Sequence, residues 1–148
     1  MKIVIQRVSR ATVRIDGVEQ AGIGEGLLLL VGVEREDGAA QADKAADKIV
    51  NLRVFSARPG LDERMERSVL DISGEILVVS QFTLAGSLRK GRRPGFDAAA
   101  PPGEAEPIYD RLIVLLCHKR ATLLWLASRT RCTAGAAGGH VIAFETSL

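Results

Sequence analysis

Residues 74–84 read Gly74-Glu-Ile-Leu-Val-Val-Ser-Gln-Phe-Thr-Leu84, and the rest of the chain is best understood around them. It contains an unbroken run of Ile, Leu and Val over residues 76–79, with Gly74 before it and Gly86 after it. A short apolar run between glycines is typical of a β-strand that is buried on both faces or lies at the centre of a sheet. We therefore predict a central strand over residues 76–79.

Polar side chains follow this predicted strand directly. Ser80, Gln81 and Thr83 place two hydroxyls and an amide at its end. Burial of such a group without a hydrogen-bond partner costs about 1–3 kcal/mol, so each group must bond to backbone, water or a ligand. Two interpretations follow. The hydroxyls close the sheet edge through local backbone bonds, or the segment forms part of a binding site.

The composition fits one folded domain over residues 1–148. Hydrophobic residues make up 47% of the chain and charged residues 26%, which is enough apolar material for a sizeable core. The formal net charge of +2 is too small to indicate a nucleic-acid partner by itself. The local clustering of charge must therefore carry that argument.

The cysteines and histidines do not suggest a metal site. Cys117, Cys132, His118 and His140 lack the paired spacing of a zinc site, and we expect neither a metal nor another cofactor. We interpret them as passive thiols and surface residues. The apolar stretch near the N-terminus reaches a charge again at Arg7, which is too soon for a signal peptide. No apolar run approaches the roughly 20 residues of a membrane span. We expect a cytoplasmic protein with reduced thiols.

Strand patterns occur on both sides of the central stretch. Asp16-Gly17 is a tight-turn signal between strands. The glycine-rich residues 22–26 precede a strand, whereas a dinucleotide-binding loop follows a strand and opens a helix, so we predict a turn or bulge there. β-branched alternation and apolar runs predict further strands at residues 2–8, 11–15, 27–33, 52–55 and 141–144.

Two stretches have the spacing of amphipathic helices. Residues 39–51 and 104–116 carry apolar side chains three and four positions apart, and the second stretch begins with acids. Together with the strands, they predict an α+β domain. We expect a sheet or partial barrel of about six strands with two or three helices packed against it.

One concentrated basic stretch, residues 87–94, follows the polar strand end. It contains four cations, Arg89, Lys90, Arg92 and Arg93. Such a loop can wrap a phosphate backbone, or it can be a solvated loop that keeps the protein soluble. Its position directly after residues 80–83 favours binding, because polar acceptors beside a basic rim suit a small group attached to a nucleic acid.

Five segments together resemble the D-aminoacyl-tRNA deacylase family, once called D-tyrosyl-tRNA deacylases. Ser-Gln-Phe-Thr is specific in this context, because the other segments accompany it in the family's order. The resemblance covers residues 1–111, roughly three quarters of the chain. The segments are Gln6-Arg-Val-Ser-Arg-Ala11, Asn51-Leu-Arg-Val-Phe55, Arg67-Ser-Val-Leu-Asp71, Ser80-Gln-Phe-Thr-Leu84 and Arg89-Lys-Gly-Arg-Arg-Pro94.

The resemblance implies a homodimeric enzyme with its active site at the subunit interface. Such an enzyme hydrolyses the ester that joins a D-amino acid, or mischarged glycine, to the terminal ribose of a tRNA, a proofreading step in translation. Ser80, Gln81, Phe82 and Thr83 are the implied catalytic segment, which supplies pocket walls and hydrogen bonds. Arg7 is implied to help hold a second loop, which reaches in from the partner subunit.

The tail, residues 117–148, departs from the family. The family's second loop carries a Gly-Pro pair with a cis peptide that excludes L-amino acids, and here Gly138 and Gly139 stand in its neighbourhood as the candidate substrate-binding residues. A cis bond before proline costs about 0.5–1 kcal/mol, against about 2.5–4 kcal/mol before other residues. We therefore expect weakened chiral rejection, weakened activity or a poorly packed tail. A reading-frame shift near residues 116–120 and true divergence both explain the departure.

Two mechanisms are open for an active form. In one, Thr83 is a nucleophile that forms an acyl-enzyme, but neither histidine lies near it in sequence to act as a base. In the other, which the resemblance favours, Gln81 and backbone N–H groups orient the ester and stabilise the oxyanion while the tRNA's ribose hydroxyl helps to activate water. Thr83 then positions the substrate.

Two other classes of function compete with this enzyme. One is a tRNA-binding or dimer-scaffold protein that lost catalysis with its tail. The other is a generic esterase with a hydroxyl nucleophile, which would carry a covalent acyl adduct on Ser80 or Thr83.

Overall fold

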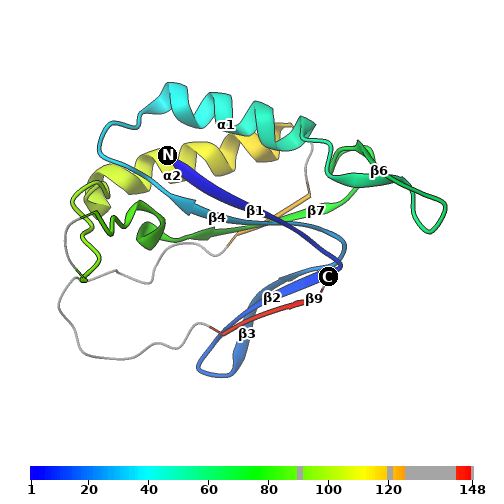
Figure 1. The fold of residues 1–148 in the computed structure, drawn as a ribbon, viewed down its shortest axis with the longest axis horizontal. Coiled ribbons are helices and arrows are strands. Elements are labelled where there is room, and N and C mark those ends of the chain that lie inside the picture. Colours follow the sequence, from blue (N-terminus) through cyan, green and yellow to red (C-terminus); the bar gives the residue numbers. More distant parts are fainter. Residues whose placement is uncertain (90–91, 120–121, 126–142, 148) are drawn as a thin grey trace.

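The computed structural model describes residues 1–89, 92–119, 122–125 and 143–147. Its elements form three layers (Figure 1). The helices α1 (Ala39–Asn51) and α2 (Pro102–His118) cover one face of a four-stranded sheet, and a three-stranded sheet lies on the other side. This arrangement of helices and sheets confirms the α+β class.

The predicted central strand is β7 (Glu75–Ser80), which lies inside the four-stranded sheet of order β1-β4-β7-β8. β1 (Lys2–Val8) is antiparallel to β4 (Gly26–Gly32), whereas β4, β7 and β8 (Thr122–Trp125) are parallel. Residues 76–79 are each at most 3% exposed. The prediction of a central strand buried on both faces is confirmed.

The alternation of side chains along β4 and β7 divides the core into two clusters. Leu29 and Val78 belong to the cluster formed with α1 and α2, whereas Leu28 and Leu77 belong to the cluster formed with the second sheet. Successive side chains of a strand point to opposite faces of its sheet. Both strands are therefore apolar at consecutive positions because both faces of their sheet are covered.

The second sheet is antiparallel and has the order β3-β2-β9. β2 (Arg10–Ile15) and β3 (Val18–Ile23) are joined by Asp16 and Gly17, whose φ angles of 51° and 78° suit a tight hairpin turn, as predicted. β9 (Ala143–Ser147) takes the place of the strand predicted over 141–144, of which residues 141–142 lie outside the described residues.

The expected single sheet or partial barrel is corrected to separate, layered sheets. The chain passes between the two larger sheets at bends, one at Ser9 and one at residues 24–25. The second bend lies within the glycine-rich stretch that was predicted to turn. These bends divide the first four strands between two sheets instead of leaving them in one.

A third sheet is the hairpin of β5 (Phe55–Arg58) and β6 (Asp62–Arg67), which projects beside the helices (Figure 1). The strand predicted over 52–55 is wrong in its placement. Leu52 caps α1, because its backbone N–H donates to the carbonyl of Ile49 at 3.3 Å, and the strand begins at Phe55. β3, β6 and β8 lie outside the predicted strand ranges, so the described residues form nine strands instead of the six or so predicted.

Both predicted helices are present and pack against each other. α1 has the predicted bounds and buries Ala42, Ala46, Ile49 and Val50. α2 extends the predicted 104–116 by two residues at each end, with proline in its first turn, where a missing N–H costs no helical hydrogen bond. At their exposed rims, the Arg111 guanidinium contacts the Asp43 carboxylate at 2.7 and 3.0 Å.

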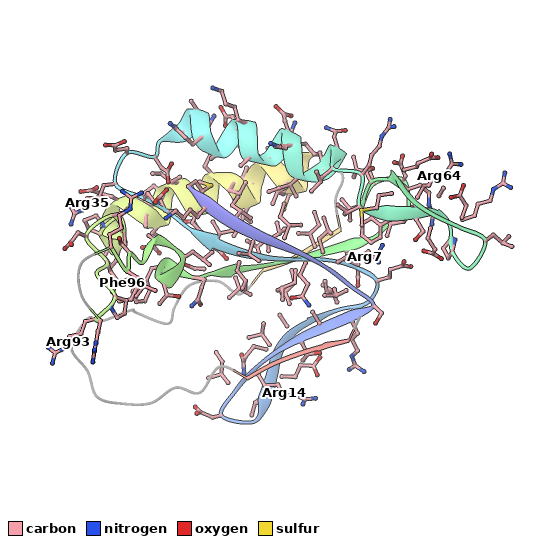
Figure 2. All side chains as sticks on the ribbon, in the orientation of Figure 1. Arg7, Arg14, Arg35, Arg64, Arg93 and Phe96 are labelled. Atoms are coloured by element: carbon pink, nitrogen blue, oxygen red, sulfur yellow. The ribbon has the colours of Figure 1, made fainter. Side chains whose placement is uncertain are left out.

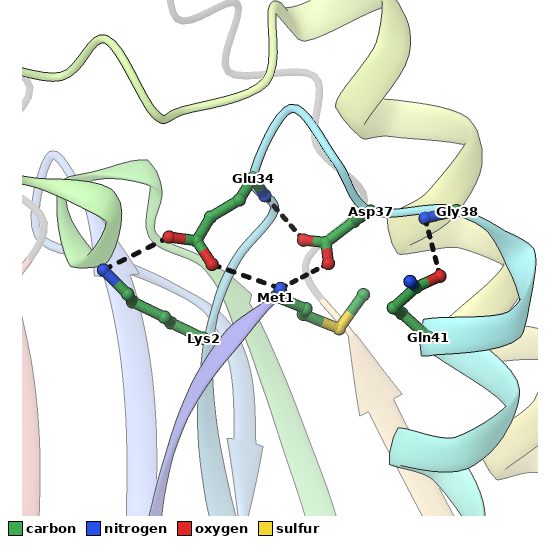
Figure 3. Close-up of polar contacts among 6 residues, drawn as sticks. All are labelled: Met1, Lys2, Glu34, Asp37, Gly38 and Gln41. Carbon is green, nitrogen blue, oxygen red and sulfur yellow. Dashed lines mark hydrogen bonds and ion pairs between the residues drawn. The ribbon is translucent and has the colours of Figure 1, made fainter.

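Polar contacts fix the connection between β4 and α1 (Figure 3). The ammonium of Met1 lies between the carboxylates of Glu34, at 3.3 Å, and Asp37, and Asp37 also accepts the backbone N–H of Glu34 at 2.7 Å. The backbone N–H of Gly38 donates to the side chain of Gln41 at 3.0 Å, which satisfies an open donor at the helix start. The contacts therefore tie the start of β1 to the connection that follows the end of β4.

Candidate active site at the end of strand β7

Residues 80–83 lie where β7 ends and the chain turns across the edge of the sheet. Ser80 is the last residue of β7, and the backbone N–H of Gln81 donates to the carbonyl of Val31 in β4 at 2.7 Å. A single 3-10 turn, η1 (Phe82–Ala85), follows at once. The carboxyl ends of parallel strands are where ligands bind in open α/β sheets, so the polar segment stands at a suitable edge.

Gly32, at the end of β4, lets this segment approach the sheet closely. A Cβ atom at Gly32 would lie 2.9 Å from the carbonyl oxygen of Gln81 and 3.0 Å from Cβ of Leu84. Both distances are shorter than ordinary van der Waals contacts. Glycine at this position therefore fixes how deeply η1 sits against β4.

The polar groups of the segment are accessible and contact each other. Ser80, Phe82 and Thr83 are exposed, and the side-chain amide of Gln81 donates to the hydroxyl oxygen of Thr83 at 2.5 Å. Within the described residues, neither the Ser80 nor the Thr83 hydroxyl bonds to a backbone group. The interpretation that these hydroxyls close the sheet edge therefore has no contact to support it there.

The basic stretch, residues 87–94, follows η1 and forms an exposed loop. Ser87 and Gly95 pair through two backbone hydrogen bonds of 2.8 and 2.9 Å, which close the base of the loop. Arg89, Arg92 and Arg93 are exposed and contact no carboxylate in the described part of the chain. Lys90 lies outside the described residues. The guanidinium groups that are described are therefore available to an anionic partner.

Arg7 lies away from residues 80–83 in the same chain. It pairs with Leu27 at the start of β4, whereas Gln81 contacts Val31 near its end, and Figure 2 places Arg7 on the side of the β5–β6 hairpin. Its guanidinium donates to the carbonyl of Val54 at 3.0 Å. The hydroxyl of Ser56 chiefly, and the charge of Arg7 to a smaller extent, hold the pKa of Glu63 below its ordinary value.

The sequence analysis missed two residues near the segment, Phe96 and Arg35. The ring of Phe96 packs edge-to-face on that of Phe82, with centroids 5.4 Å apart. Arg35, on the β4–α1 connection, donates from Nε to the carbonyl of Asp97 at 2.7 Å. An aromatic residue just after a basic run is the sequence signal that could have found Phe96.

The remaining candidates lie at the end of α2 or beyond the described residues. Cys117 and His118 are exposed in the last turn of α2. Gly138, Gly139, His140 and Cys132 fall outside the described residues. Within residues 1–89, 92–119, 122–125 and 143–147, no group of three or more His, Cys, Asp or Glu could hold a metal ion. None of the helices in these ranges is long and apolar enough to cross a membrane.

A surface depression of about 270 Å³ lies on the second sheet and shares no residue with the segment at the end of β7. Its lining includes the buried hydroxyl residue Thr12 together with Arg10 and Glu19. The arrangement of polar, aromatic and basic groups around residues 80–96 therefore remains the stronger candidate for a functional site.

A comparison with known families decides the assignment. The family described as D-Tyr-tRNA(Tyr) deacylase matches residues 4–128, which include the whole candidate site at residues 80–96. The chain belongs to the D-Tyr-tRNA(Tyr) deacylase family. The match extends beyond the resemblance seen in residues 1–111 and ends before Gly138 and Gly139.

Proteins of this deacylase family are about half identical to the chain over the aligned residues. A D-aminoacyl-tRNA deacylase of Geotalea uraniireducens is 53% identical over 113 residues, which cover 76% of this chain and 71% of the relative. Those of Geotalea daltonii and Ruegeria pomeroyi are each 56% identical, over 109 and 110 residues. These matches cover 74% of this chain and 71% and 74% of the relatives.

Two solved structures share the fold of this protein. A c-Myc DNA unwinding element binding protein superposes with a TM-score of 0.78 at 32% identity, over 100% of this chain and 91% of that protein. A probable eukaryotic D-amino acid tRNA deacylase superposes with a TM-score of 0.73 at 14% identity, over 98% and 92% of the two chains. At that identity the second likeness supports the fold alone.

Proposed function

We propose that this protein is a D-aminoacyl-tRNA deacylase that hydrolyses the ester between a D-amino acid and the terminal ribose of tRNA. The single observation that carries the proposal is the family match over residues 4–128, with relatives of that name about half identical. Free D-amino acid and tRNA are the products, and mischarged glycyl-tRNA is a second substrate. We infer that the enzyme acts in the cytoplasm, where tRNA is charged.

Residues 80–83 are the proposed catalytic segment. Ser80 and Thr83 are exposed at the end of β7, and Gln81 is held at the sheet edge by its bond to Val31. In this proposal, Gln81 and backbone N–H groups of the segment orient the ester and stabilise the charge that develops on its carbonyl oxygen. Arg89, Arg92 and Arg93 attract the phosphates of the acceptor end.

Thr83 positions the ester and does not attack it. Its hydroxyl oxygen already accepts a hydrogen bond from the Gln81 amide, which cannot act as a base. No His, Asp or Glu of the described residues contacts the hydroxyl, although a threonine nucleophile needs such a base. These contacts support a mechanism in which the ribose hydroxyl of the tRNA helps to activate water.

A homodimer with the active site at the subunit interface completes the proposal. The segment at the end of β7 is exposed on the single chain, and Phe82 keeps 44% of its surface accessible. An ester pocket needs walls that exclude bulk water. A second subunit would supply these walls, with Gly138 and Gly139 in the reaching loop and Arg7 supporting it. A molar mass of a single chain, measured by light scattering at assay concentration, would oppose this arrangement.

The first experiment is single-turnover hydrolysis of matched D- and L-aminoacyl-tRNA by the purified protein. Release from the D form alone supports the proposed activity and shows that the tail still rejects L substrates without the family's proline. Release from both forms keeps the enzyme but places a defect in chiral rejection. Binding of tRNA without release of either amino acid favours the scaffold protein over the enzyme.

A further inference from the structure

Phe82 and Phe96 form an exposed aromatic pair beside the candidate active site. Their ring planes meet at 66° with centroids 5.4 Å apart, and 44% and 38% of their surfaces remain accessible. Large aromatic side chains are normally covered in a folded protein, since burial of their apolar surface is favourable. An exposed pair of this kind therefore suggests a partner with an aromatic face.

The surrounding backbone holds Phe96 in this place. A Cβ atom at Gly86 would lie 3.0 Å from Cε1 of Phe96, so the ring lies directly over the glycine. The paired backbones of Ser87 and Gly95 fix the residue before Phe96, and Arg35 fixes the residue after it through the carbonyl of Asp97. Hydrogen bonds therefore hold the chain in place both before and after Phe96.

Cationic side chains border the same surface. Figure 2 shows Arg35 and Arg93 on the same side of the molecule as Phe96. Both are exposed, and neither forms an ion pair with a carboxylate of the described residues. Aromatic side chains for stacking, next to arginines for the backbone, are the combination that binds single-stranded nucleic acid.

We propose that Phe82 and Phe96 form a stacking platform for the unpaired nucleobase at the 3′ end of the tRNA, with Arg35 and Arg93 on the adjoining phosphates. The inference rests on the proposed function. The sequence of residues 81–83 supports this placement of the base, since Phe82 lies between Gln81 and Thr83. The base and the aminoacylated ribose belong to one nucleotide, so a base on Phe82 would bring the ester to Gln81 and Thr83.

The test uses tRNA whose 3′-terminal adenosine is replaced by 2-aminopurine, a fluorescent adenine analogue that is quenched by stacking. We expect quenching on binding to the wild-type protein, its loss in Phe96→Leu, and its return in Phe96→Trp. Phe96→Leu should raise KM for D-aminoacyl-tRNA about tenfold with little change in kcat, because stacking acts equally on bound substrate and transition state. Leu61→Ala, in the distant β5–β6 turn, is the matched control.

Three results would overturn the platform. Wild-type protein that binds the labelled tRNA without quenching excludes stacking of the terminal base. Unchanged quenching and KM in Phe96→Leu remove Phe96 from the site while leaving the deacylase activity intact. A changed molar mass in Phe96→Leu assigns the pair to a subunit contact instead. Failure of the wild-type protein to hydrolyse ordinary D-aminoacyl-tRNA is a separate result that refutes the proposed function.

Discussion

The side-chain amide of Gln81 donates a hydrogen bond to the hydroxyl oxygen of Thr83, two residues further along the chain. The bond occupies one of the two lone pairs of the oxygen that would attack in a nucleophilic mechanism, and it brings no base to that oxygen. It also leaves the hydroxyl proton free to be donated to a bound ester. This relationship assigns a testable role to each of the two side chains.

The first prediction concerns Thr83→Ala. The loss of one hydrogen bond to a charged transition state costs about 1.5–3 kcal/mol, so single-turnover hydrolysis should slow about 10- to 150-fold and remain measurable. Thr83→Ser keeps the hydroxyl and should recover most of the rate. Complete loss of turnover in Thr83→Ala, with an acyl adduct on quenched wild-type protein in intact-mass spectra, would establish the nucleophilic mechanism instead.

Gly32→Ala should displace the candidate active site. The new Cβ would lie 2.9 Å from a backbone oxygen, which cannot rotate away as a side chain could. Overpacking of this kind costs about 1–3 kcal/mol, so we expect both a lower melting temperature and a slower deacylation rate.

Gly103→Ala is the matched control for that substitution. Gly103 lies in the first turn of α2, and nothing lies within 4 Å of its added Cβ. Alanine loses less conformational entropy there and should leave stability unchanged or raise it by up to about 1 kcal/mol. A Gly32→Ala protein as stable and as active as this control would contradict the close approach of η1 to β4.

Arg92→Gln and Arg93→Gln should weaken tRNA binding in a salt-dependent way. Each arginine that neutralises a phosphate contributes about 0.7–0.9 to the slope of log K against log salt concentration. We expect each variant to flatten the slope by about that amount in a titration from low to physiological salt. Arg64→Gln on β6 should leave the slope unchanged, because Arg64 already pairs with Asp62 and Glu66. Equal slopes in all proteins would mean that the loop is merely solvated.

The ion pair between the helices should stabilise the protein in a pH-dependent way. The hydrogen bond from Arg111 holds the pKa of Asp43 below its ordinary value of 3.8. Because the pKa is lower in the folded state, the stabilisation is complete above the unfolded pKa and is lost as pH falls through the folded value. The difference in melting temperature between wild type and Asp43→Asn should therefore shrink below about pH 4.

Asp110→Asn serves as the control for this measurement. Asp110 is an exposed carboxylate on α2, next to Arg111 in sequence, and it forms no ion pair with the described residues. Its substitution should change the melting temperature little over the same pH range. A wild-type advantage over Asp43→Asn that stays constant down to pH 3 would contradict the assigned role of the pair.

The spacing of hydrophobic residues in the sequence predicted the helices and strands that pack into the hydrophobic core. α1 was placed with its correct bounds because Ala42, Ala46 and Ile49 face the sheet at helical spacing. β7 was placed because both of its faces are covered. β6 was missed because its sequence, Asp-Glu-Arg-Met-Glu-Arg, is charged. Its pairing with β5 is made by backbone groups and requires no hydrophobic pattern in the side chains.

The candidate site was predicted in part. Residues 80–83 were found because polar groups after a buried strand need partners, and the structure places them at the sheet edge. Phe96 was missed, since its contact with Phe82 spans a loop and depends on the small surface of Gly86. Contacts of this kind depend on how the loop folds back, which residue spacing does not encode.

The pairing of β2 with β9 joins segments from nearly opposite ends of the chain, with Arg10 opposite Ser147. During synthesis, β2 is therefore made long before its neighbour, and one of its edges stays open until residues 143–147 have left the ribosome. An open strand edge can pair with other chains and promotes aggregation. The nascent protein is consequently open to misassembly at this edge of β2 until β9 has been synthesised.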